Sequence, residues 1–123
     1  MIQNSVNKTY DLEERTFQFA KEVRLFIKSL EKTIANFEDA KQVVRSSGSI
    51  GANYIEANES LSKKDFYYRI KISRKEAKES IYWLRLINET NKHSNEILVE
   101  KLIQESTELK KIFSAIIEKS KPV

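Results

Sequence analysis

The chain of 123 residues contains no cysteine, one histidine, one proline and two glycines. Without cysteine, thiol catalysis, disulfide scaffolds, thiolate zinc sites and cysteine-ligated iron–sulfur clusters are all excluded. A single histidine also excludes any site that needs two imidazole ligands. Because glycine and proline are so scarce, the chain lacks the turn residues from which β-hairpins are built, and the composition argues against an all-β fold.

Long apolar runs are also missing. No segment reaches the roughly 18 consecutive apolar residues that a transmembrane helix needs, and the polar start, up to Tyr10, lacks the apolar stretch of a secretory signal. We therefore expect a cytoplasmic protein with no membrane partner. Charged residues make up 33% of the chain and apolar ones 40%, which is typical of a soluble globular protein. The length suits a single domain over residues 1–123.

Apolar residues recur at helical spacing through nearly the whole chain, which predicts four helices. We expect them over residues 12–33, 37–59, 63–88 and 95–118, with a frayed tail over 119–123. Three residues have the type and position of N-caps, each with an acidic residue three positions later; they are Asp11, Asn36 and Ser62. Similar lengths and short connections favour antiparallel neighbours, so we predict an all-α fold, an up-down-up-down antiparallel four-helix bundle.

Both glycines, Gly48 and Gly51, fall inside the second predicted helix. Each costs about 1 kcal/mol there relative to alanine, and a close approach of two backbones would compensate for that cost. The third predicted helix offers small residues at Ser73, Ala77 and Ser80. We therefore expect the second and third helices to cross tightly at these positions.

Positive charge is concentrated in the third predicted helix. The chain has a net charge of +4, and residues 63–92 hold nine basic and four acidic side chains. On a helical wheel, five cations and two tyrosines share the face opposite the apolar positions. This basic face consists of Lys64, Tyr68, Lys71, Lys75, Lys78, Tyr82 and Arg85. Such a row can follow phosphates while the rings stack on bases, or it is a solvated face that keeps a long helix soluble.

Two further surfaces are candidates for subunit contact. Ile72 and Trp83 form an apolar edge on the third helix that suits a partner, such as another copy of the chain, or else extends the core. Opposite the core positions of the second helix lies a polar column, made of Gln42, Arg45, Ser46, Ser49, Asn53 and Glu56. This column either forms hydrogen bonds across a subunit contact or faces water.

The sequence offers no catalytic or metal-binding constellation. A di-iron bundle needs a Glu-x-x-His pair on each of two helices, whereas the one histidine, His93, lies in a polar turn. The spacing of Gly48 and Gly51 matches a KH-domain GxxG loop, but here it falls inside a helical pattern. Walker, GxGxxG and GxSxG motifs are absent. We therefore expect no catalytic residue, metal, cofactor or small-molecule substrate, and a protein that is not an enzyme.

Residues 43–87 resemble a known family. They read VVRSSGSIGANYIEA, then SKKDF, then KEAKESIYWL, which is similar to bacterial four-helix bundle proteins named for the 23S rRNA intervening sequences in which some are encoded. The matching positions are Arg45, Ser49, Ile50, Asn53, Glu56, Ala57, Ser62, Asp65, Phe66, Glu76, Glu79, Trp83 and Leu84. Many members have glycine after the glutamate where this chain has Ala57. Alanine lets the second helix continue toward Asn58.

The resemblance implies a homopentameric barrel of four-helix bundles. It also implies similarity to the accessory variability protein of diversity-generating retroelements, a basic pentamer that engages nucleic acid and a reverse transcriptase. It favours a structural or subunit-facing role for Arg45, Ser49, Asn53 and Glu56, and an interface role for Trp83. Together with the basic face, it leads to the hypothesis of a non-enzymatic oligomer that binds RNA or DNA, with RNA favoured. The alternative is a protein-interaction scaffold whose basic face binds an acidic protein.

Overall fold

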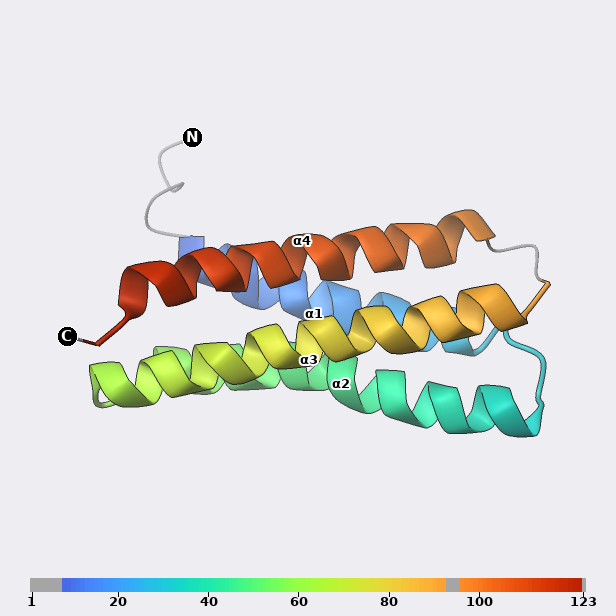
Figure 1. The fold of residues 1–123 in the computed structure, drawn as a ribbon, viewed down its shortest axis with the longest axis horizontal. Coiled ribbons are helices and arrows are strands. Elements are labelled where there is room, and N and C mark those ends of the chain that lie inside the picture. The colour runs from blue at the N-terminus through green and yellow to red at the C-terminus, as the bar shows by residue number, and fades with distance from the viewer. Residues whose placement is uncertain (1–7, 93–95, 123) are drawn as a thin grey trace.

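The computed structural model describes residues 8–92 and 96–122 and contains four α-helices. They are α1 (Lys8–Ile27), α2 (Ile34–Asn58), α3 (Lys63–Thr90) and α4 (Glu96–Ser120). Consecutive helices run antiparallel, and α4 closes the bundle by packing against both α3 and α1 (Figure 1). The predicted all-α, up-down-up-down four-helix bundle is confirmed.

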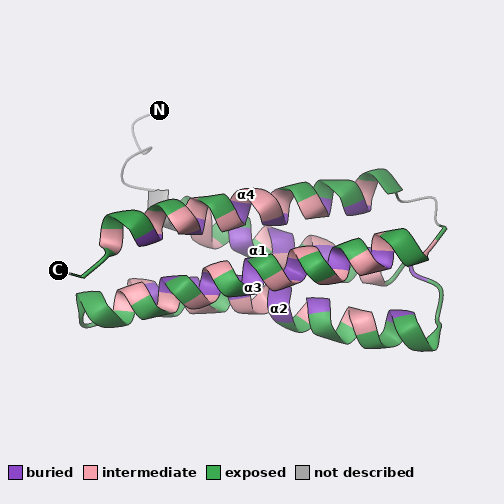
Figure 2. Ribbon diagram, in the orientation of Figure 1, coloured by how far each residue is buried: buried purple, intermediate pink, exposed green. Residues whose placement is uncertain are grey.

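The core runs the length of the bundle, and buried positions recur along each helix (Figure 2). Phe26 of α1, Ile50 of α2, Leu84 of α3 and Phe113 of α4 are all fully buried. The ring of Phe113 also meets Tyr54 edge to face, with 5.6 Å between the ring centroids. Because each such side chain stabilises the fold by about 1.5–3 kcal/mol when fully buried, this core holds the bundle together without disulfides.

The start of α3 agrees with its predicted cap, and the starts of α1 and α2 do not. The Ser62 hydroxyl accepts a hydrogen bond from the backbone N–H of Asp65 at 3.0 Å. At α2 the cap is Thr33, whose Oγ1 accepts from the backbone N–H of Asn36 at 3.1 Å. The helix therefore begins at Ile34 rather than at residue 37. Helix α1 begins at Lys8, before the predicted cap Asp11.

Asn36 is not the N-cap that the sequence predicted. Its side chain instead links the α1–α2 loop to the end of α3 by hydrogen bonds. Its side-chain amide donates to the Glu31 carbonyl at 2.9 Å and to Oδ1 of Asn91 at 2.8 Å. Asn91 in turn donates to Oδ1 of Asn36 at 2.9 Å and to the Ile87 carbonyl at 2.8 Å. The two buried or half-buried amides thus satisfy each other across two loops.

The other helix ends also refine the prediction. Helix α1 ends at Ile27 rather than at residue 33, and α4 continues through Ser120, into the tail that was expected to fray. Helix α2 continues to Asn58, which agrees with the expectation from Ala57. The predicted start of the fourth helix at residue 95 and the turn around His93 lie outside the described residues.

Serines, rather than glycines, bring α2 and α3 together. Ser46 and Ser80 share a hydrogen bond of 2.8 Å between their buried hydroxyls. Ser73 donates to the backbone carbonyl of Ile50 at 2.9 Å, which places the third helix directly against the backbone of the second. The predicted contact at Ser73 and Ser80 is therefore present, although the glycines do not create it.

The two glycines of α2 face α1 instead. A Cβ atom built at Gly51 would lie 2.7 Å from Oγ1 of Thr16, and one built at Gly48 would lie 3.2 Å from Nη2 of Arg24. Arg24 also donates from Nη2 to the Val44 carbonyl at 3.3 Å. The expectation that glycine opens the α2–α3 contact was wrong. The close approach that these glycines permit belongs to α1 and α2.

Candidate nucleic-acid interface

The structure places all seven residues of the basic face on exposed or solvent-facing positions of α3. From Lys64 to Arg85 the row extends roughly 32 Å along the helix axis, at 1.5 Å per residue. The tyrosines Tyr68 and Tyr82 are 61% and 58% exposed. The C-terminal end of the row has partners on α3 itself, because Arg85 is paired with Glu89 at 3.6 Å and the ring of Tyr82 packs edge-on against that of Trp83.

The middle of the basic face borders a groove between α3 and α4, with a volume of about 660 Å³. This α3–α4 groove is lined by Tyr68, Lys71, Ile72, Arg74, Lys75, Lys78, Lys110 and Ser114. Five of these eight side chains are cations and none is a carboxylate. Arg74 and Lys110 were not among the predicted site residues. Lys110 belongs to a different helix, so no periodicity within α3 could have shown it.

Among the described residues, the cations of the groove form no ion pair with an acidic side chain. Across residues 8–92 and 96–122, no salt bridge engages a lysine or arginine that lines the α3–α4 groove. The nearby acidic side chains of α3, Glu76 and Glu79, are directed instead to Arg45 of α2. Because like charges are gathered there without a carboxylate in the lining, the arrangement favours a positive local potential.

The polar column of α2 is tied mainly to α3 of the same chain. Nη2 of Arg45 lies 3.2 Å from Oε1 of the buried Glu76 and 3.0 Å from Oε1 of Glu79. Ser46 is itself buried in the bundle, so it does not belong to an outward-facing column. These contacts give Arg45 a place inside the fold of one chain.

Two other members of the column form a second link to α3. Asn53 donates to the carbonyl and to Oγ of Ser49, both at 2.9 Å. Its Oδ1 accepts from Nη1 of Arg69 at 3.3 Å. Glu56, like Arg45, lies on the exposed surface, so a part for these two residues in a subunit contact stays a prediction.

The predicted apolar edge of α3 is only half exposed. Ile72 is half-buried and lines the α3–α4 groove. Trp83 is half-buried and packs against the hydrophobic core. Both positions are compatible with an extended core, so their part in a subunit contact stays a prediction.

A larger exposed apolar surface lies on α1 and α2, where no interface was predicted. Five large apolar side chains are 46% to 87% exposed there; they are Phe17, Leu25, Ile34, Phe37 and Ile55. A groove of about 560 Å³ runs between the two helices and is lined in part by Gly48, Gly51 and Ala52. We call this surface the apolar face. It lies on the opposite side of the bundle from the α3–α4 groove, since α3 and α4 stand in front of α1 and α2 in Figure 1.

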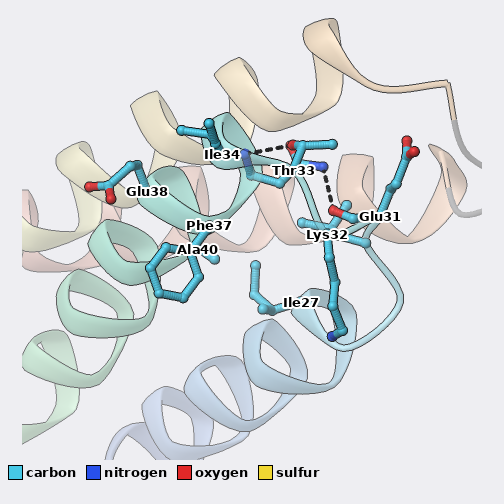
Figure 3. Close-up of a pocket in the computed structure, with 10 residues that line it drawn as sticks. Ile27, Glu31, Lys32, Thr33, Ile34, Phe37, Glu38 and Ala40 are labelled. Atoms are coloured by element: carbon cyan, nitrogen blue, oxygen red, sulfur yellow. Dashed lines mark hydrogen bonds between the residues drawn. The ribbon is translucent and has the colours of Figure 1, made fainter.

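The apolar face continues to the end of the bundle where α1 passes into α2. Figure 3 shows a hollow there, with Ile27 from α1 and Phe37 from α2 on either side of it. Ile34, the first residue of α2, adds a side chain that is almost fully exposed. Its neighbour Thr33 is the N-cap of α2, so Ile34 is presented by the capped first turn of that helix.

Neither a membrane span nor a metal centre was found in the described residues. None of the four helices combines the length and the apolar character needed to cross a membrane. Within residues 8–92 and 96–122, acidic and imidazole side chains do not gather in threes as a metal site would require.

Comparison with known proteins agrees with the arrangement of the helices. The model of the 23S rRNA-intervening sequence protein family matches residues 8–115. A crystal structure of a protein of unknown function from the S23 ribosomal protein family of Bacteroides thetaiotaomicron is 33% identical, with a TM-score of 0.74. The alignment covers 85% of this chain and 96% of that one, while no curated protein matches. The chain therefore belongs to the 23S rRNA-intervening sequence protein family.

Proposed function

We propose that this protein is a non-enzymatic, cytoplasmic nucleic-acid-binding protein that uses the basic face of α3, with RNA favoured over DNA. The observation that carries the proposal is the set of cations in the α3–α4 groove, which has no carboxylate in its lining and no ion pair among the described residues. A polyanion that binds there releases its condensed counterions, which drives association without any sequence-specific contact.

Self-association is part of the same proposal. Monomeric proteins rarely expose large contiguous apolar patches, and the apolar face presents five large apolar side chains. Covering this face with other copies would leave the α3–α4 groove, on the other side of the bundle, open to a ligand. The pentamer implied by the family resemblance would carry five copies of a net +4 charge, and similarity to the retroelement accessory protein would fit such a basic ring.

Fluorescence anisotropy with labelled structured RNA and labelled duplex DNA, titrated across a salt series, tests the proposal. We expect binding that weakens steeply with salt, with log K falling by roughly 0.7–0.9 per phosphate contact for each unit of log salt concentration. The Lys71/Lys75/Lys78→Glu variant should lose this binding. A matched control, Lys101/Lys111/Lys119→Glu, makes the same change of charge on exposed positions of α4 and should lose much less.

Circular dichroism and light scattering establish first that both triple variants keep the fold and the oligomeric state of the parent. A flat salt profile, or equal losses in the two variants, would contradict the proposal. Saturable binding to an acidic protein with no affinity for either nucleic acid would assign the basic face to a scaffold function instead.

A further inference from the structure

The α3–α4 groove has cations on both walls and an apolar surface, a combination that a row of lysines on one exposed helix would not provide. Lys71, Lys75 and Lys78 rise from α3 on one side, and Lys110 comes from α4 on the other. The half-buried Ile72 also lines the groove and gives it an apolar surface. A ligand that fits this groove carries negative charge along its edges and an apolar surface that can be buried.

Tyr68 adds a flat aromatic surface at the same groove. Its side chain is 61% exposed, so most of the ring has no protein partner. The neighbouring Tyr67 differs, because its ring is covered by Nζ of Lys71 at 5.2 Å from the centroid. An exposed ring beside unpaired cations is the combination on which unpaired bases stack in proteins that bind single strands.

We propose that the α3–α4 groove binds single-stranded nucleic acid, with the phosphates between the lysines of α3 and Lys110 and a base stacked on Tyr68. This inference rests on the proposed function and names the form of nucleic acid that the site selects. Successive lysines of α3 lie about one helical turn, roughly 5.4 Å, apart. A strand laid along α3 therefore meets a cation at each turn of the helix.

A duplex can contact the charged part of this site but not its apolar and aromatic part. Its phosphates can approach the lysines, but its base faces are stacked inside the helix, and the base edges in the major groove of A-form RNA are out of reach of side chains. Ile72 and Tyr68 would then remain uncovered. An unpaired strand offers phosphates and base faces together, so it buries the apolar part of the groove and neutralises the charged part.

The test compares one labelled RNA strand of about 12 nucleotides, within the range of known single-strand sites, with the same strand annealed to its complement. The full-length protein is titrated with each by fluorescence anisotropy across the same series of salt concentrations. We expect the single strand to bind at least about tenfold more tightly than the duplex. Tyr68→Ala should weaken single-strand binding by about 5- to 150-fold, the range measured for loss of one base stack, and leave duplex binding unchanged.

Two control variants show whether a loss of single-strand affinity is specific to the groove. Ile97→Ala truncates an exposed apolar side chain of α4 that lies outside both the basic face and the groove, and it should change single-strand affinity by less than about twofold. Lys110→Gln should weaken single-strand binding. It should also reduce the slope of log K against log salt concentration by about the value of one phosphate contact. Lys111→Gln, at the next residue, removes a cation that is already paired with Glu108 at 3.7 Å and should have little effect.

The outcomes distinguish this inference from the proposed function on which it rests. Equal affinity for single strand and duplex, with no loss in Tyr68→Ala, overturns the inference while the proposed function stands. Equal losses in Tyr68→Ala and Ile97→Ala also overturn it, because the loss would then not depend on the groove. Absence of binding to either form overturns both.

Discussion

Gly51 of α2 lies against Thr16 of α1 with no room for a side chain. A Cβ atom at position 51 would stand 2.7 Å from Oγ1 and 3.1 Å from Cβ of Thr16. The hydroxyl of Thr16 is held in place, because the residue is buried and donates to the Glu13 carbonyl at 2.8 Å. Because Gly51 has no side chain, α1 and α2 approach closely at this position, and a groove is left in the apolar face.

The first prediction compares the two glycines of α2. Gly51→Ala gains about 1 kcal/mol of helix propensity but forces a methyl group against Thr16, which typically costs about 1–3 kcal/mol. We expect net destabilisation of up to about 2 kcal/mol in urea unfolding. Gly48→Ala meets only the end of the flexible Arg24 side chain, so it should be neutral or slightly stabilising. Equal stability of the two variants would show that α1 can move away from α2 at little cost.

The second prediction concerns the ion pairs of Arg45. The carboxylate of Glu76 is buried, whereas Arg45 is 54% exposed, so loss of the guanidinium leaves a buried acceptor without its charged donor. Arg45→Gln should destabilise the chain by about 1–3 kcal/mol. Glu79→Gln removes only the more exposed partner and should cost less than about 1 kcal/mol. Unfolding is measured at two protein concentrations, and an Arg45→Gln effect that disappears on dilution would assign Arg45 to a subunit contact instead.

The third prediction tests the reciprocal amides of Asn36 and Asn91. Asn36→Asp replaces a donor by an acceptor that faces Oδ1 of Asn91 and the Glu31 carbonyl, so three oxygens would meet without a hydrogen between them. We expect a loss of about 1–3 kcal/mol at neutral pH, measured by thermal or urea unfolding. Asn36→Ser serves as the control, because it removes the amide without adding charge. If Asn36→Ser destabilises the protein as much as Asn36→Asp does, the missing hydrogen bonds of the side-chain amide, rather than the added charge, account for the effect.

The fold was predictable because four segments repeat their apolar positions at one period, and the positions of Phe26, Ile50, Leu84 and Phe113 are buried as that period requires. The helix ends were less predictable. Thr33 and Asn36 are both residue types that cap helices, so local sequence alone did not distinguish them. The deciding partner is Asn91, which lies far along the chain and reaches Asn36 only after the bundle has formed.

The candidate site was predictable only within single helices. A wheel drawn for α3 placed Lys71, Lys75 and Lys78 on one face, but it could not show that Lys110 of α4 completes the groove. The apolar face was missed for the same reason. Phe17 and Ile55 each fall outside the core positions of their own helix, and only the packing of α1 on α2 brings them to one surface.

The last prediction assigns self-association to the apolar face. Phe17 is 61% exposed, so Phe17→Asp leaves the core of one chain intact but places a charge where a second copy would bury an apolar ring. We expect light scattering after size exclusion to show a shift toward the 14.4 kDa monomer. Ile97→Asp makes the same kind of change at an exposed position of α4 and should leave the mass unchanged.

The nucleic-acid affinity of the Phe17→Asp variant then separates the two surfaces. If the apolar face joins copies whose α3–α4 grooves act together, the monomeric variant retains each groove but loses the avidity of several linked sites, which can exceed the affinity of one site by about 100-fold or more. A long RNA should therefore bind the variant far more weakly than the parent, while a short strand that fills one groove should bind both about equally. A parent protein that is already monomeric at all concentrations would refute the assignment of the apolar face.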